Sequence, residues 1–251
     1  MTKELKKLRS EIIKLSHQKK SGHIPSAFSI LEALEALYGN VLIDGDEFIL
    51  SKGHGSLALY AILMRYGHIT YEEFLSYAEF NSNLGGHPDR NKIKKVFAST
   101  GSLGHGLPIA VGVALSRKIQ NKPGKIYCLV GDGECNEGTV WESAMLASKL
   151  KLDNLVCIVD FNNSQIRSLP LEQIESKFAS FGWESIFVED GHNVDDIALS
   201  LKEKSSKPLC VVLRTIKGYG LESLQNDMFS WHHRSPNDEE LIRFLREIEA
   251  E

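Results

Sequence analysis

The segment 131–163 constrains the fold of this chain more than any other. It opens with GDG directly after an apolar run at 126–130, and it closes with NN soon after a second apolar run at 155–159. Apolar residues on one face of a helical pattern lie between the two runs, at Val140, Ala144, Ala147 and Leu150. The segment therefore predicts a strand, a tight turn, a helix and a second strand parallel to the first.

Polar residues follow both of these strands. Asp132 comes after the first strand and Asn162 after the second. Ligands of open α/β sheets bind at the carboxyl ends of the strands. Carboxylate and amide oxygens suit Mg²⁺ or Ca²⁺, which typically keep phosphate and water oxygens as further ligands. Gly131 and Gly133 would let the backbone approach a diphosphate, so the sequence predicts a metal–phosphate site at this edge.

Helical and strand patterns alternate along the whole chain. We expect helices at 3–18, 26–39, 56–66, 71–79, 106–119, 138–150, 193–204 and 237–248. We expect strands at 47–50, 125–130, 155–160, 184–188 and 209–214. Such alternation predicts an α/β fold with a doubly wound, mainly parallel sheet and helices on both faces. No linker interrupts it, so we expect one domain, 1–251, in which the aperiodic stretch 217–237 crosses a functional site.

Composition excludes several classes of protein. Of the 251 residues, 42% are hydrophobic and 25% charged, as in ordinary soluble domains, and the net charge of −4 argues against a nucleic-acid surface. No apolar run approaches the roughly 20 residues of a membrane helix, and the amino terminus lacks the features of a signal peptide. Cys128 and Cys157 fall in buried-strand patterns, which suits reduced thiols. We therefore expect a cytoplasmic protein without membrane or nucleic-acid partners.

Histidines and glycines recur together in four further segments. Histidine follows glycine or tryptophan at Gly22-His23, Gly53-His54, Gly86-His87 and Trp231-His232. Each pair alone is more typical of a turn than of a ligand site, and none has the spacing of a helical zinc site. The stretch TGSLGHG at 100–106 precedes a helix, but its glycines are not spaced as in the dinucleotide-binding fingerprint.

Together these segments resemble the amino-terminal part of transketolase, in the family's order and over essentially the whole chain. The motifs are SGHIPSA at 21–27, LSKGHG at 50–55, GGHPD at 85–89, TGSLGHG at 100–106, GDGECNEG at 131–138, DFNN at 160–163 and WHHRSPND at 231–238. The resemblance implies the thiamine-diphosphate-binding fold of the diphosphate (PP) type. The pyrimidine-binding domain that follows in full-length transketolases is absent here, so the chain resembles the smaller subunit of a split transketolase.

The resemblance also implies roles for individual residues. Asp132, Asn162 and the backbone carbonyl of Ser164 would ligate Mg²⁺, for which Ca²⁺ or Mn²⁺ can substitute. The residues that would bind thiamine diphosphate are His54, Gly101, Ser102, Leu103, Gly131, Asp132, Gly133, Glu134, Asn162, Ile166 and His232. The catalytic histidines that would line the substrate channel are His23, His54, His87 and His232. Glu137 would reach across an interface toward the partner site.

The implied reaction moves a two-carbon ketol unit from a ketose, or ketose phosphate, to an aldose acceptor. In this family the catalytic glutamate lies in the missing domain, so the chain would be active only with a carboxy-terminal subunit, as an α₂β₂ complex. Three segments depart from the family pattern, namely Ile24-Pro25, His105 and the stretch 163–168. These departures leave the metal ligands intact and bear on which sugars are used.

Two alternatives stay open at this point. The first is the α subunit of a 2-oxo acid dehydrogenase, or an enzyme like deoxyxylulose-phosphate synthase. A dehydrogenase subunit would supply GDG and NN but not the GHP, GSLG and WH segments. The second is a non-catalytic regulatory module that binds thiamine diphosphate, against which the intact Asp132, Asn162 and channel histidines argue.

Overall fold

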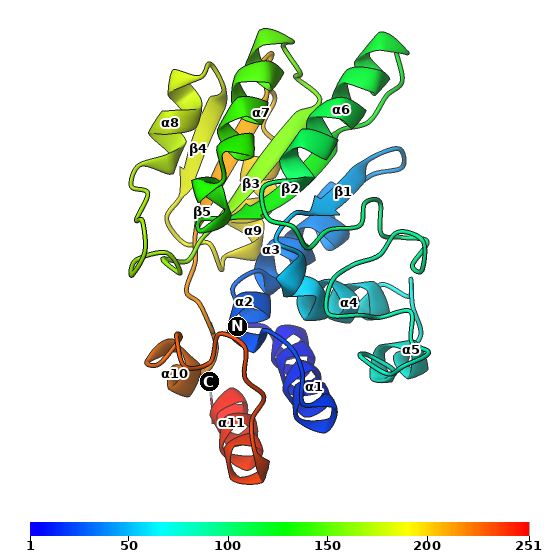
Figure 1. Cartoon of the computed structure of the whole chain (residues 1–251), viewed down its shortest axis with the longest axis vertical. Helices are drawn as coiled ribbons and strands as arrows, with labels where there is room; N and C mark the ends of the chain where they lie inside the picture. The colour runs from blue at the N-terminus through cyan, green and yellow to red at the C-terminus, as the bar shows by residue number, and fades with distance from the viewer. Residues whose placement is uncertain (251) are drawn as a thin grey trace.

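A five-stranded parallel sheet organises the molecule, in a computed structural model that describes residues 1–250 (Figure 1). The strand order is β1-β2-β3-β5-β4, and every neighbouring pair is parallel. The strands are β1 (Glu47–Leu50), β2 (Ile126–Gly131), β3 (Leu155–Phe161), β4 (Glu184–Val188) and β5 (Leu209–Arg214). The predicted doubly wound α/β fold is confirmed. Because all strands run the same way, their carboxyl ends meet at one edge, beside α2 (Ile24–Phe28).

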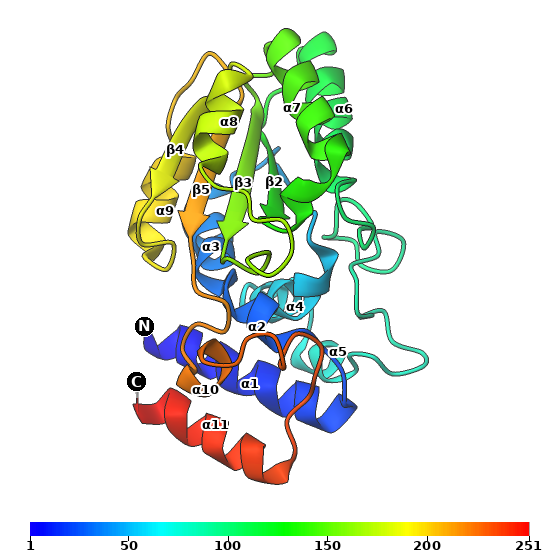
Figure 2. The same cartoon turned by 60° about the vertical axis from the view of Figure 1, so that its left-hand side comes forward.

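Helices cover both faces of the sheet. On one face lie α6 (Gly106–Ile119), α7 (Gly138–Lys149) and α8 (Ile174–Ser180), and on the other lie α3 (Leu31–Ala36) and α9 (Val194–Leu201) (Figure 2). Successive strand residues point to opposite faces, so β2 sends Cys128 into one apolar cluster and Leu129 into the other. Cys128 and Cys157 are fully buried free thiols, as the strand patterns predict.

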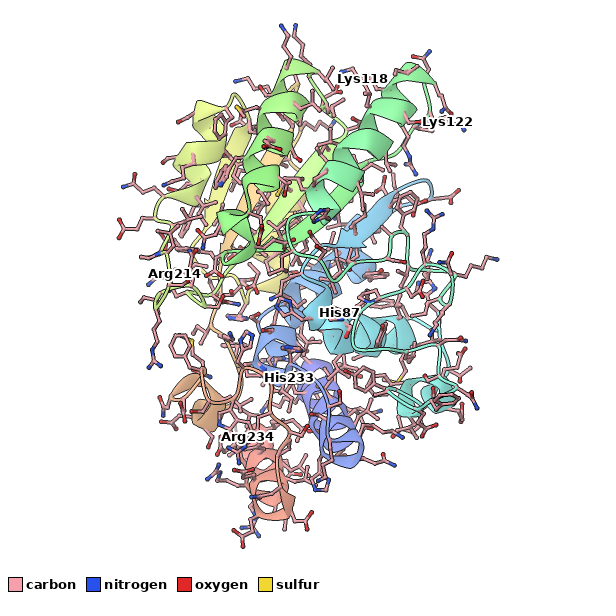
Figure 3. The ribbon with its side chains drawn as sticks, in the orientation of Figure 1. His87, Lys118, Lys122, Arg214, His233 and Arg234 are labelled. Carbon is pink, nitrogen blue, oxygen red and sulfur yellow. The ribbon has the colours of Figure 1, made fainter. Side chains whose placement is uncertain are left out.

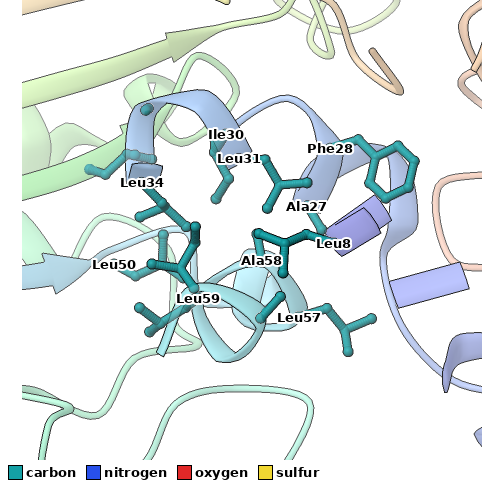
Figure 4. Packing of buried hydrophobic residues seen from close by; sticks show 14 of the residues in the cluster. Leu8, Ala27, Phe28, Ile30, Leu31, Leu34, Leu50, Leu57, Ala58 and Leu59 are labelled. Carbon is teal, nitrogen blue, oxygen red and sulfur yellow. The ribbon is translucent and has the colours of Figure 1, made fainter. Parts of the chain in front are cut away.

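A helical layer closes the carboxyl edge of the sheet. It consists of α1 (Lys3–Lys19), α2, α4 (Ser56–Arg65) and α11 (Asp238–Ala250), with the short α5 (Tyr71–Leu75) and α10 (Glu222–Gln225) beside it. Leu8, Phe28 and Leu57 carry the packing between α1, α2 and α4 (Figure 4). In both cartoon views α1 and α11 lie side by side. No helix within residues 1–250 combines the length and apolarity needed to span a membrane.

The helix predicted at 26–39 is wrong in its continuity. The chain forms α2, breaks at Ser29, forms α3 and ends in a π-helical turn, Leu37–Val41. The Ser29 hydroxyl lies 3.2 Å from the Ser26 carbonyl oxygen and 2.7 Å from Asp160 Oδ2. Serine side chains compete with helical backbone bonds. Here the break also points the hydroxyl at the end of β3.

Three other predictions differ from the structure in extent. The helix predicted at 71–79 ends at Leu75, because Ala78 takes a left-handed conformation (φ +59°) and its amide bonds the Leu84 carbonyl. Helix α8 was missed because its apolar face is short. The aperiodic stretch 217–237 contains the four-residue α10, too brief for periodicity to reveal.

Candidate active site

A cavity of about 420 Å³ lies at the carboxyl edge of the sheet. The fold brings most of the sequence-predicted site residues into its wall. Those lining it are His23, His54, His87, Gly101, Leu103, Gly131, Asp132, Gly133, Glu134, Asn162, Ser164 and His232. All four predicted channel histidines are therefore neighbours of the predicted metal ligands, although they come from four separate loops.

Three predicted residues lie outside this wall. Ile166 is 58% exposed, and Ser102 and Glu137 are also exposed. Glu137 precedes the first residue of α7, on the outer side of the molecule. Their predicted roles toward the cofactor and the interface stay predictions.

Three oxygen-bearing residues meet where β2 and β3 end. The Ser164 hydroxyl donates to Asp132 Oδ1 over 2.7 Å, and the Ser164 amide lies 3.1 Å from Asp132 Oδ2 and 3.0 Å from Asn162 Oδ1. The parallel register sets this arrangement, because it places Gly131 beside Asp160 and so brings the residues that follow together. Clustered carboxylate, amide and hydroxyl oxygens suit a hard divalent cation.

Burial makes Asp132 dependent on its surroundings. Its carboxyl is inaccessible, and desolvation raises its pKa even though Ser164 and the Gly133 amide bond it. A buried carboxylate keeps its charge most readily when a cation compensates it. The environment of Asp132 therefore favours a bound cation.

An ion pair lies beneath the oxygen cluster. Lys52 Nζ is 2.5 Å from Asp160 Oδ2, and both side chains are almost fully buried. The same oxygen accepts from the Ser29 hydroxyl (2.7 Å) and from Asn162 Nδ2 (2.8 Å), while Thr215 bonds Oδ1. Burial alone would raise the pKa of Asp160, but Lys52 and these bonds bring it below its ordinary value. Because the amide nitrogen of Asn162 is held by Asp160, its oxygen faces Ser164.

Lys217 brings a second cation to the cavity. Its side chain enters from the segment after β5 and is only 2% exposed. Among residues 1–250 its ammonium makes one hydrogen-bond contact, with His232 Nδ1 at 3.1 Å, and no salt bridge. Burial and the nearby Lys52 lower its pKa to about 8, so it stays largely protonated at pH 7. A buried ammonium without a carboxylate is costly, and an anion in the cavity would compensate it.

The histidines form a contiguous imidazole cluster. The His23 ring centroid lies 5.4 Å from that of His54, 5.5 Å from His232 and 4.5 Å from His233. Figure 3 places His87 and His233 in the middle of the molecule, near α2. Burial and neighbouring cations lower the pKa of His23 to about 4 and that of His54 further still. Both rings are therefore neutral at pH 7 and can each donate and accept one hydrogen bond.

Glu134 braces the glycine-rich loop 100–106 against β2. Its carboxylate accepts from the Ser51 hydroxyl and from the amides of Gly104 (2.8 Å) and Gly131 (3.1 Å). Gly104 has a φ of +79°, and a Cβ there would lie 2.5 Å from Thr139 Oγ1. The bonds of Glu134 thus all go to protein, so it orders the cavity wall.

Sequence reasoning missed several residues that build the site. The cavity wall also contains Ser26, Lys52, Asn136, Gln165, Ser168 and Lys217. The edge rule that singled out Asp132 could have found Lys217, which lies three residues after β5 ends. Lys52 lies two residues before His54, in a motif where only the histidine suggested a ligand.

Comparison with known proteins identifies the family. Residues 2–248 match the family model for the transketolase, thiamine diphosphate binding domain. The chain is 34% identical to one subunit of the apulose-4-phosphate transketolase of Phocaeicola vulgatus, over 96% of this chain and 91% of that protein. It is 36% identical to the 6-deoxy-6-sulfo-D-fructose transketolase subunit SqwG of a Clostridium species, over 92% and 89%. The Leishmania mexicana transketolase structure superposes with a TM-score of 0.87 at 25% identity, over 98% of this chain and 41% of that one.

The chain belongs to the transketolase thiamine diphosphate-binding domain family. It spans about two fifths of the length of the solved transketolases it matches, but nine tenths or so of the relatives that are named as single subunits. The predicted resemblance to the amino-terminal part of transketolase is thereby confirmed. So is the likeness to one subunit of a split enzyme.

The lowered pKa of His23 predicts acid sensitivity of the fold. Between about pH 6.5 and about pH 4 the unfolded chain binds a proton at this residue and the folded chain does not, so falling pH favours unfolding. Replacing His23 by Asn removes this contribution. Urea unfolding should show that wild type loses stability relative to His23→Asn as the pH falls through this window. A stability difference that does not change with pH would contradict the neutral, buried state of His23.

Proposed function

We propose that this chain is the thiamine-diphosphate- and Mg²⁺-binding subunit of a two-component transketolase. It would transfer a two-carbon ketol unit from a ketose, or ketose phosphate, donor to an aldose acceptor. One observation carries the proposal. A single cavity holds an oxygen cluster suited to a divalent cation and a buried ammonium that lacks a carboxylate partner among residues 1–250. A metal–diphosphate group compensates both at once.

The residues present fit this group. Asp132, the Asn162 oxygen and the Ser164 backbone carbonyl would hold Mg²⁺, and the same oxygen set would accept Ca²⁺ or Mn²⁺. Lys217 would face the diphosphate, with His54 and His232 beside it. Lys52 would act indirectly, since its charge is already matched by Asp160. Leu103 and Gly101, in the wall nearest the glycine loop, would meet the aminopyrimidine side of the cofactor.

The imidazole cluster accounts for substrate handling. When bound, thiamine diphosphate supplies the electron sink that cleavage beside a ketose carbonyl requires and that side chains cannot provide. Neutral His23, His54, His87 and His232 would bond the hydroxyls of the sugar and exchange protons with them. His233, in contact with His23, extends the cluster toward the outside.

A partner subunit would complete the site. The relatives named as single transketolase subunits support a carboxy-terminal partner that carries the pyrimidine domain and the catalytic glutamate. On this chain, α6 and α7 expose Ile109, Met145 and Leu146 on neighbouring helices, and Glu137 precedes α7. We infer an α₂β₂ complex in which this face is covered. The buried free thiols suit the reducing cytoplasm.

The metal ligands provide the first test of this proposal. Asp132→Ala removes a charged ligand and should abolish Mg²⁺-dependent binding of thiamine diphosphate. Asn162→Ala removes only a dipole and should weaken binding severely without abolishing it. Calorimetric titration of the two-subunit enzyme measures both. Ile43→Ala, at an exposed position at the far end of β1, is the control. Unchanged affinity in Asp132→Ala would refute the metal assignment.

The histidines provide the second test. Alanine at His23 or His87 should lower kcat by about 10²-fold or more, the usual effect of losing a proton-transfer group, and should raise KM for the ketose donor. Alanine at His54 or His232 should also weaken cofactor retention. His68→Ala, outside the cavity beside Tyr38, is the matched control and should be near neutral. If His23→Ala and His87→Ala were as harmless as the control, the channel assignment would fail.

The exposed apolar face provides the third test. Met145→Glu together with Leu146→Glu places charges on α7 and should prevent assembly with the partner subunit, because burying unpaired charges is costly. The control, Ile43→Glu, alters an exposed apolar residue at the opposite edge of the sheet. Light scattering of the co-expressed subunits should give an α₂β₂ mass for wild type and control only. Normal assembly of the double variant would place the interface elsewhere.

A further inference from the structure

A buried polar cluster lies behind the cavity, on the far side of Lys217. It joins Arg9 of α1, Glu32 of α3 and His192 of the loop between β4 and α9. All three side chains are almost completely buried. They converge on residues 216–220, the segment that leaves β5 and carries Lys217, which we call the strap. In Figures 1 and 2 this segment runs from the end of β5 toward α10.

Arg9 bonds the strap and Glu32 simultaneously. Its Nε donates to the Tyr219 carbonyl over 2.9 Å, and its Nη2 lies 2.9 Å from one Glu32 oxygen and 3.0 Å from the other. The guanidinium lies 5.2 Å from the Phe28 ring centroid and 5.4 Å from that of Tyr219. Gly220 lacks a side chain where one is not tolerated, since a Cβ there would come within 2.9 Å of Arg9 Nε. The strap thus packs directly on the arginine.

His192 grips the strap from the other side. Its Nε2 accepts a hydrogen bond from the Ile216 amide over 2.8 Å, and its Nδ1 lies 3.2 Å from Glu32 Oε2. Because Nε2 accepts, Nδ1 carries the proton and donates it to the carboxylate. The ring also stacks on Tyr219, with centroids 3.6 Å apart and planes 10° from parallel. Sequence spacing alone gave His192 no role, since it lies outside every motif of the site.

The cluster brackets Lys217 without touching it. His192 holds the residue before Lys217, Arg9 holds the second residue after it, and the Gly218 amide bonds the Pro25 carbonyl over 3.0 Å. The backbone on either side of Lys217 is therefore fixed, and its side chain has one direction left, into the cavity toward His232. Burying the Arg9–Glu32 pair gains little stability by itself, because desolvation offsets the attraction. Its position suits the orientation of a neighbouring segment.

We propose that Arg9, Glu32 and His192 are positioning residues that hold the strap so that Lys217 stays aimed at the diphosphate. Glu32 is the hub of the cluster, because it neutralises Arg9 and fixes the tautomer of His192. The inference rests on the proposed function for the identity of the anion. It goes beyond that function in assigning part of cofactor affinity to residues outside the cavity.

Two substitutions of His192 separate positioning from simple filling of space. The amide nitrogen of asparagine matches Nδ1, so His192→Asn keeps a donor toward Glu32 and loses the acceptor for the Ile216 amide. The amide oxygen of glutamine matches Nε2, so His192→Gln keeps that acceptor. If the strap is what matters, glutamine should preserve function and asparagine should not. A role limited to Glu32 predicts the reverse order.

The experiment measures the affinity of the two-subunit enzyme for thiamine diphosphate in the presence of Mg²⁺, by calorimetry. We expect His192→Asn to weaken binding about tenfold, the effect of losing one buried hydrogen bond, and His192→Gln to stay close to wild type. Amide hydrogen exchange of the cofactor-free enzyme should show faster exchange at residues 216–220 in His192→Asn only. Arg9→Lys, which keeps the charge beside Glu32 but loses the bond to Tyr219, is a second variant with the same expected effects.

A double-mutant comparison decides whether the effect runs through Lys217. If it does, adding His192→Asn or Arg9→Lys to Lys217→Ala should weaken binding no further. Additive losses, or asparagine tolerated better than glutamine, would overturn the positioning role. Failure of the wild-type enzyme to bind the cofactor would refute the proposed function instead. The exchange measurement would then still report whether the cluster holds the strap, and unchanged exchange in both His192→Asn and Arg9→Lys would overturn that claim too.

Discussion

The buried ion pair between Lys52 and Asp160 is the interaction on which the rest of the site depends. Two charges removed from water are tolerated only when further hydrogen bonds satisfy them. Asp160 meets this condition with bonds from Ser29, Asn162 and Thr215. Each of these partners comes from a different segment, so the carboxylate joins α2, β3 and the start of the strap. The floor of the cavity is consequently a single connected unit.

This arrangement explains how a neutral amide can serve as a metal ligand. Asn162 could present either its oxygen or its nitrogen to the cavity. Asp160 accepts from the nitrogen, so the oxygen is turned toward Ser164 and Asp132. Lys52 keeps Asp160 charged, and its own charge is thereby matched inside the protein. Lys217 is left as the cavity's cation without a carboxylate among residues 1–250, and an anionic ligand would complete it.

The sequence was sufficient for whatever follows from local pattern. Period and spacing located all five strands, and the shared edge of parallel strands brought Asp132 and Asn162 together. The break at Ser29 was not predictable, because its cause is Asp160, 131 residues away. Nor was His192, whose partners lie on α3 and the strap. Ser102, Ile166 and Glu137 were assigned by resemblance alone, and they lie on the open side, where a second subunit would make their contacts.

The central claim is that Asp132, Asn162 and Ser164 hold a metal whose diphosphate partner faces Lys217. The most direct measurement is a crystal structure of the two-subunit complex with thiamine diphosphate and Mn²⁺, read by anomalous scattering. The account predicts one metal peak within coordination distance of Asp132, the Asn162 oxygen and the Ser164 carbonyl, with a diphosphate oxygen next to the Lys217 ammonium. A metal peak away from these three oxygens, or a diphosphate remote from Lys217, would contradict it.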